Sequence, residues 1–126
     1  MAEADLGAVL ALPALATSVA RARRAVVQVL RDAGREDLCD TAALLVSEVV
    51  TNAVLHGDGT VEVRADVRDV VLRVEVEDDG PGVPALRDAG PDAEGGRGLA
   101  LVEALSRDWG VQQVAGGKYV WFVVDR

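Results

Sequence analysis

The sequence has few of the residues that many proteins use for covalent stability or for large packed cores. It contains one cysteine and one histidine, and only 3% of its residues are aromatic. A single cysteine excludes an intramolecular disulfide and fits a reducing compartment, so we expect Cys39 to serve packing rather than redox chemistry. Because aromatic residues are scarce, the hydrophobic core must be built from valine, leucine and alanine.

The chain also has fewer positively charged than negatively charged residues. The chain has 13 lysine and arginine residues against 21 aspartate and glutamate residues, which gives a net charge of −8. Nucleic-acid binding depends on clustered positive charge, so we expect no nucleic-acid partner. The one basic cluster, around Arg21, Arg23 and Arg24, fits a solvated helix face, and a docking surface for an acidic protein is the alternative.

Signals for membrane insertion or export are missing as well. No apolar run has the length of a membrane span. The apolar segment 6–20 follows acidic residues, whereas a signal peptide begins with positive charge. We therefore expect a cytoplasmic protein that has no membrane partner.

The hydrophobic pattern of the 126 residues predicts a single domain with one core. Helical spacing predicts helices at 17–32, from 37 or 40 to 56, and at 98–107, and Thr17 or Ser18 is expected to cap the first. Alternation predicts strands at 9–12, 60–67, 70–76, 109–114 and 118–124, with a turn at 68–69. Residues 80–97 are rich in glycine, proline and aspartate, which predicts a mobile loop. Helices and strands in separate blocks favour a two-layer α+β sandwich with a mostly antiparallel sheet.

A first polar motif lies on the second predicted helix. Glu48, Asn52 and His56 are spaced four residues apart and therefore form one row beside a broad apolar face. Polar side chains in such a place cost free energy unless they find partners or open onto a cavity. A partly exposed polar stripe is the simpler interpretation of this motif alone, and the wall of a binding site is the other.

A second motif ends a predicted strand, where Asp78 is followed by Gly80 and Gly82. A plain turn shaped by Pro81 would explain it. Alternatively, glycine lets the backbone approach a flat ligand closely, and the carboxylate of Asp78 accepts a hydrogen bond from an exocyclic amino group. Asp79 is one residue out of phase and is the weaker choice for this contact.

A third motif, Gly96-Arg97-Gly98, opens the third predicted helix. Backbone amides at a helix N-terminus bind phosphate oxygens, and Arg97 can add a charge-assisted contact. The pattern is neither a Rossmann fingerprint nor a P-loop. In this order and spacing, the three motifs together predict a nucleotide pocket.

The combination of motifs resembles the GHKL ATPase superfamily, and specifically its small anti-sigma-factor serine/threonine kinases of actinobacteria. Residues 45–57 (LVSEVVTNAVLHG) resemble the N box, 76–84 (VEDDGPGVP) the first glycine box, and 96–110 (GRGLALVEALSRDWG) the second. Residues 117–121 (GKYVW) are similar to the usual ending of that branch. The resemblance covers residues 10–124 and implies the Bergerat fold. In that fold helices lie on one face of a mixed, mostly antiparallel sheet, within a single ATP-binding domain over 1–126 whose lid is residues 80–97.

The resemblance also implies roles for individual residues. Asn52 would coordinate Mg²⁺ through its side-chain oxygen, with ATP phosphates and waters completing the shell. Glu48 would be the general base for a serine hydroxyl or water, and Asp78 would read the amino group of adenine. His56 would have only a supporting role. The remaining ATP-binding residues implied are Gly80, Gly82, Gly96, Arg97, Gly98 and Leu99.

The function implied by the resemblance is that of a protein-serine kinase in a partner-switching pathway. Such a kinase passes the ATP γ-phosphoryl group to a serine of an anti-sigma-factor antagonist and binds a sigma factor. The alternative is an ATP-gated protein-binding switch that transfers nothing. A third hypothesis is that the chain is the catalytic domain of a histidine kinase. Residues 1–36 contain no histidine that could accept phosphate, which speaks against it. A homodimer through strand 9–12 is also implied, because an exposed strand edge invites pairing.

Overall fold

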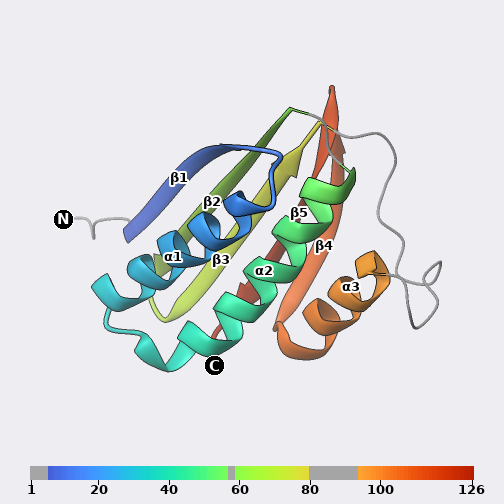
Figure 1. The fold of residues 1–126 in the computed structure, drawn as a ribbon. Helices are drawn as coiled ribbons and strands as arrows, with labels where there is room; N and C mark the ends of the chain where they lie inside the picture. Colours follow the sequence, from blue (N-terminus) through green and yellow to red (C-terminus); the bar gives the residue numbers. More distant parts are fainter. Residues whose placement is uncertain (1–5, 57–58, 80–93) are drawn as a thin grey trace.

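The computed structural model describes residues 6–56, 59–79 and 94–126, and it shows two layers. Helices α1, α2 and α3 lie on one face of a five-stranded sheet, with α2 between the other two (Figure 1). The elements in chain order are β1 (Leu6–Pro13), α1 (Thr17–Asp32), the short 3₁₀ helix η1 (Glu36–Leu38), α2 (Cys39–His56), β2 (Thr60–Arg68), β3 (Val71–Asp78), α3 (Glu94–Leu105), β4 (Asp108–Val114) and β5 (Gly117–Val124).

The strands follow the order β1-β2-β3-β5-β4, and each neighbouring pair is antiparallel. The predicted α+β sandwich is therefore confirmed. A parallel pair, which a mixed sheet would contain, does not occur among the described strands. The register places Val61 of β2 and Lys118 of β5 directly opposite Asp78 of β3, on its two sides. These three residues form one row across the end of the sheet where β3 finishes.

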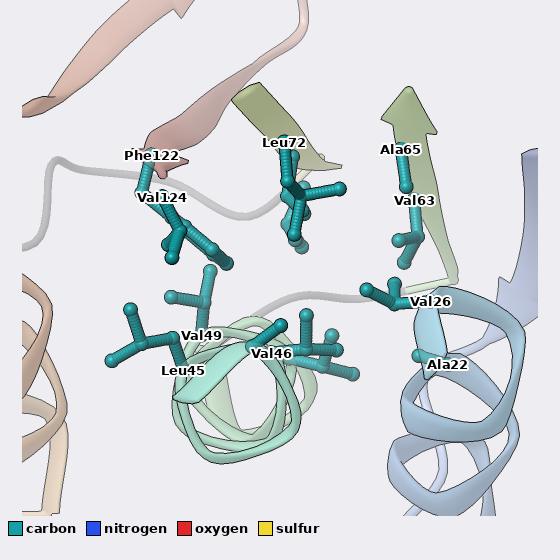
Figure 2. Close-up of a cluster of buried hydrophobic side chains, with 14 of the residues drawn as sticks. Ala22, Val26, Leu45, Val46, Val49, Val63, Ala65, Leu72, Phe122 and Val124 are labelled. Atoms are coloured by element: carbon teal, nitrogen blue, oxygen red, sulfur yellow. The ribbon is translucent and has the colours of Figure 1, made fainter. Parts of the chain in front are cut away.

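The hydrophobic core fills the space between the sheet and the helices. Side chains of β2, β3 and β5 point towards α1 and α2, whose apolar side chains point back (Figure 2). The period of two in the strands and of about 3.6 in the helices produces this arrangement, because each puts apolar residues on one face. The broad apolar face predicted on the second helix is buried, and its members are Ala42, Val46, Val49, Val50 and Ala53.

The central helix α2 is unusually apolar for an element of a small domain. Within the described residues, one helical segment, Glu36–Leu55, is long and apolar enough to cross a membrane by length and composition, contrary to expectation from the sequence. That measure is weak, because a buried core helix passes the same test. Since α2 packs against the sheet and against both α1 and α3, we interpret its composition as that of a core helix.

The start of α1 differs from the prediction that Thr17 or Ser18 caps it. The N-cap position is Ala16, and no side chain caps the helix. The hydroxyl of Ser18 donates instead to the carbonyl oxygen of Pro13, at 2.7 Å, and the Ser18 side chain is fully buried. Ser18 therefore ties the first turn of α1 to the end of β1, a tertiary contact that local sequence does not announce.

The turn between β2 and β3 is shifted by one residue from the predicted position. It lies at residues 69–70, and Asp69 has a φ of 56°, a left-handed conformation that aspartate tolerates better than most residues. Val70 is consequently 59% exposed and does not share the buried face of Leu72 and Val74. The alternate positions of both strands are buried, namely Val61, Val63, Ala65 and Val67 of β2 and Leu72, Val74 and Val76 of β3.

Candidate functional site

The candidate site begins with the polar row on α2. Glu48 is half-buried and Asn52 is only 7% exposed, while the side chain of His56 lies outside the described part of the structure. The Asn52 Oδ1 atom is buried and has no hydrogen-bond partner among the described residues. An unpartnered buried acceptor costs about 1–3 kcal/mol, so this atom is placed where a ligand could satisfy it.

The chemistry of Asn52 Oδ1 fits the predicted Mg²⁺. A side-chain amide oxygen is a hard ligand of the kind that Mg²⁺ prefers, and this cation usually keeps several waters and takes only one or two protein ligands. No group of three or more histidine, cysteine, aspartate or glutamate side chains that could hold a metal occurs in the described residues. The prediction that Asn52 holds a cation together with oxygen atoms of the nucleotide and of water needs no such group.

Asp78 occupies the last position of β3, on the face that the helices cover. It follows Leu72, Val74 and Val76 at intervals of two, and all three are buried. Asp78 Oδ1 accepts a hydrogen bond from Lys118 Nζ at 2.8 Å, and both side chains are 4% exposed. Opposite charges and a hydrogen bond offset part of the large cost of burying two ions. The prediction that Asp78 ends this strand is thus confirmed, whereas its role in reading a base stays a prediction.

Lys118 is the residue at this site that sequence reasoning missed. It is the only lysine in a chain with 12 arginines, since 13 basic residues minus one lysine leaves 12. It also shares the strand face of Val120 and Phe122, which are buried. A lone lysine at an inward-facing strand position was a usable signal, because a buried ammonium needs a buried partner of opposite charge.

Gly117 lets β5 approach the end of β3 closely. A Cβ atom at this position would lie 2.1 Å from the carbonyl oxygen of Asp78 and 3.0 Å from the Cα atom of Asp79. The obstacle is backbone, which cannot move aside as a flexible side chain can. Glycine at 117 therefore sets the strand spacing that brings Lys118 to Asp78.

The third motif lies within α3 rather than before it. The helix begins at Glu94, so the prediction that it begins at Gly98 is wrong, and so is the loop prediction for residues 94–97. Glycine disfavours helix, which misled the prediction, but packing of α3 against α2 through buried residues such as Leu99 overrides that preference. The first four amides of a helix lack intrahelical partners, so a phosphate site at this end would use residues 94–97.

The rest of the predicted site lies outside the described residues. This applies to Gly80 and Gly82, to most of the predicted lid, and to the side chains of residues 94–98, including Arg97. The structure brings three features to the helix-covered side of the sheet: the polar row on α2, α3 beside α2 (Figure 1), and the Asp78–Lys118 pair at the end of β3. An amide oxygen, a buried carboxylate and a helix N-terminus on the same side of the sheet define an α+β domain suited to binding a nucleotide and its cation.

Cys39 lies apart from these groups, at the start of α2. Its side chain is half-buried among core residues, and burial raises the pKa of its thiol. A raised thiol pKa lowers the fraction of reactive thiolate. The geometry therefore agrees with a packing role for this cysteine.

The family of this chain follows from comparison with known proteins. A family model for the histidine kinase-like ATPase domain matches residues 12–124, and the chain belongs to this family, within the GHKL superfamily. It is an ATPase domain of the histidine kinase-like type. The resemblance inferred from the motifs is confirmed at this level.

Curated relatives come from actinobacteria. The chain is 37% identical over 78 residues to the sensor histidine kinase component HK1 of Mycobacterium tuberculosis, covering 52% of this chain and 46% of that protein. The same identity and length relate it to a probable sensor histidine kinase of another strain, of which it covers 21%. An uncharacterised protein of Streptomyces coelicolor is 43% identical over 76 residues, covering 54% of this chain and 70% of that protein. The chain thus spans about half or less of the length of the two sensor kinases that it matches.

Solved structures agree with the fold. The histidine kinase domain of the blue-light-activated histidine kinase from Erythrobacter litoralis has a TM-score of 0.57 and 26% identity, covering 90% of this chain and 61% of that one. The histidine kinase AdeS of Acinetobacter baumannii has a TM-score of 0.56, with 94% of this chain and 67% of that one covered. At 13% identity, the second match shows the shared fold alone.

Proposed function

We propose that this domain binds ATP with Mg²⁺ and acts as a protein-serine kinase on an anti-sigma-factor antagonist. The observation that carries ATP binding is the buried, unpartnered Oδ1 of Asn52 in a histidine kinase-like ATPase domain. A core helix keeps such an atom at a cost of about 1–3 kcal/mol, which binding of a cation can offset. The choice of a serine as acceptor rests on the resemblance of the motifs to the anti-sigma-factor kinase branch.

The polar groups of the candidate site each have a role in this proposal. Asp78 accepts a hydrogen bond from the amino group of adenine, and the N-terminal amides of α3 hold phosphate oxygens. Bound Mg²⁺ supplies neutralisation of phosphate charge, with Asn52 as its protein ligand. Glu48 lies one turn before Asn52 and is only half-buried, so its carboxylate can meet a hydroxyl arriving from outside the domain.

The proposed transfer step needs one proton acceptor. The serine oxygen attacks the γ-phosphorus while Glu48 takes the hydroxyl proton, the bond to the bridging oxygen breaks, and ADP leaves with that oxygen. Positioning and electrostatics supply most of the catalysis in phosphoryl transfer, so loss of the base affects the rate and leaves the affinity for ATP intact.

The experiment that tests Glu48 is the variant Glu48→Ala, assayed on a partner recovered by pull-down and identified by mass spectrometry. We expect phosphotransfer to fall by about 10²–10⁴-fold, the usual contribution of a general base, with ATP affinity kept. Asp40→Ala is the matched control, because Asp40 is an exposed carboxylate in the first turn of the same helix. Unchanged phosphotransfer by Glu48→Ala would rule out the general-base role.

Two other functions lead to different outcomes of the same assay. The similarity to sensor histidine kinases favours transfer to a histidine of another segment or protein. Phosphohistidine is lost in acid whereas phosphoserine survives it, so acid treatment of the labelled partner separates these two acceptors. An ATP-gated switch without kinase activity would hold its partner in a nucleotide-dependent way and give no labelled product in either case.

Self-association is proposed through β1. This strand lies at one edge of the sheet, and its residue Val9 is 64% exposed. An exposed edge strand offers backbone donors and acceptors to a second strand. We expect the wild-type protein to dimerise and Ala11→Pro, which removes a backbone donor from the edge strand, to weaken the dimer in light-scattering measurements.

A further inference from the structure

The buried Asp78–Lys118 ion pair has a feature that the proposed ATP site does not explain. Reading an amino group requires only an acceptor, yet this acceptor is held by a lysine that is itself 3% exposed. Charged residues are almost never fully buried unless they are paired, and lysine carries a large cost of desolvation. Lys118 is the only lysine of the chain, and it pairs with the Asp78 carboxylate.

We infer that Lys118 is a positioning residue for base recognition, which holds the Asp78 carboxylate in the orientation that accepts a hydrogen bond from the amino group of a purine. This inference rests on the proposed ATP-binding function and deepens it, because it makes selection of the base depend on a second residue. Lys118 acts through Asp78, and contact between Lys118 and the nucleotide is not required.

Burial supplies the first reason for this dependence. A buried charged group is costly unless it is paired and hydrogen-bonded, so the Asp78 carboxylate needs a fixed partner. The ammonium group of Lys118, 2.8 Å from Oδ1, supplies that partner and fixes the orientation of the carboxylate. An ionised carboxylate is an acceptor only, so the oriented group presents lone pairs to an amino group.

Strand register supplies the second reason. Asp78 and Lys118 are directly opposite each other, and Gly117 allows the two strands to approach at that point. The ammonium therefore reaches the carboxylate from the neighbouring strand, on the helix-covered face of the sheet, in the row that also contains Val61. A carboxylate has about four acceptor positions, so bonding to one lysine leaves it able to accept further donors.

The unmodified protein allows a direct test, because lysine labelled with ¹⁵N gives a single side-chain resonance. The two probes are ATP and the triphosphate of purine riboside, which is ATP without the 6-amino group. We expect both to bind with Mg²⁺, and only ATP to shift the Lys118 Nζ resonance strongly, since only ATP donates to the partner of that nitrogen. Equal shifts with the two nucleotides would contradict the inference.

The affinities of Lys118 variants for the same two nucleotides test the role of Lys118 a second way. A hydrogen bond to a charged group is typically worth about tenfold to a hundredfold, so the wild type should prefer ATP by that ratio. In Lys118→Gln the ratio of the affinity for ATP to the affinity for the analogue should fall towards one. The reason is that ATP should bind more weakly, while the affinity for the analogue stays nearly unchanged. Lys118→Arg, which keeps the charge, should retain most of the ratio.

A purely structural role gives a different pattern. Val120→Ala is the matched control, because Val120 is buried on the same face of β5, two residues away, and its truncation loosens packing without removing charge. It should lower the melting temperature and leave the ATP-to-analogue ratio unchanged. If Lys118→Gln weakened both nucleotides equally, as a general loosening would, Lys118 would have no positioning role.

Two further outcomes separate the inference from the proposed function. Failure of the wild type to bind either nucleotide would overturn ATP binding itself. Binding of both with equal affinity would leave the nucleotide site intact but remove the reading of the amino group and, with it, the role of Lys118. If Lys118→Gln does not fold, the labelled wild type and Lys118→Arg still test the role of Lys118. Loss of the preference for ATP over the analogue in the arginine variant contradicts the inference.

Discussion

Replacement of Asn52 by leucine separates stability from function at the centre of the site. The side chain is 7% exposed and its Oδ1 atom is buried without a partner among the described residues. Removing an unsatisfied acceptor recovers about 1–3 kcal/mol. Leucine has a similar branched shape and adds apolar surface on the same side of α2 as Val49, which lies three residues earlier and is buried.

We therefore expect Asn52→Leu to raise the free energy of unfolding of the nucleotide-free protein by about 1–3 kcal/mol. For a chain of this size each kcal/mol corresponds to roughly 3–6 °C in melting temperature. Urea unfolding without nucleotide measures the gain. The same variant should lose the stabilisation that Mg²⁺ and ATP give the wild type, because a ligand stabilises only a folded state that binds it.

The matched control is Thr41→Val, a change from a polar to an apolar side chain on the same helix, at a half-buried position three turns from Asn52. It should keep the stabilisation by Mg²⁺ and ATP in full. A less stable Asn52→Leu protein would show that Asn52 is satisfied in solution and refute the reasoning about its carbonyl. Undiminished stabilisation of that variant by Mg²⁺ and ATP would remove Asn52 from the proposed cation site.

Three other predictions concern residues around the site and at the start of α2. Gly117→Ala should cost about 1–3 kcal/mol in urea unfolding and weaken ATP binding, because its Cβ meets the Asp78 carbonyl oxygen; wild-type behaviour would contradict the close strand approach. Cys39 should react slowly with a thiol reagent in the folded protein and quickly in urea, since burial raises its pKa; equal rates would refute burial as the cause. The Arg35 hydrogen bond lowers the pKa of Asp37, so this pair adds stability above the unfolded value of 3.8 and loses it as pH falls through the lower folded value. The urea midpoints of wild type and Asp37→Asn should therefore differ at neutral pH and converge in acid, and a constant difference would refute the assignment.

The fold was accessible from the sequence because hydrophobic periodicity reports it directly. Alternating valines on β2 and β3 and helical spacing in α2 decide which faces are buried, and the structure buries them as expected. Boundaries were less accessible. The helix α3 begins four residues early despite its glycines, because packing against α2 outweighs their low propensity for helix.

The candidate site divides along the same line. The motifs nominated Asn52 and Asp78 by residue type and spacing, and both are buried on the helical side of the sheet. The inward-facing position of Lys118 can be read from the sequence, but its pairing with Asp78 cannot, since the two residues are 40 positions apart in the chain. The link between Ser18 and Pro13 was likewise hidden, because Ser18 matches the composition of a helix cap and uses its hydroxyl elsewhere.

By itself, the sequence determined the two-layer architecture and the family, and it nominated the residues that we propose bind a nucleotide, because periodicity and motif spacing are local properties of the chain. Only the tertiary structure decided which polar atoms are satisfied. It left the Asn52 carbonyl oxygen buried without a partner among the described residues, and it paired Asp78 with the single lysine through the register of β3 and β5. Hydrogen-bond and charge partners depend on which distant strands and helices come together, and only the packed structure settles that.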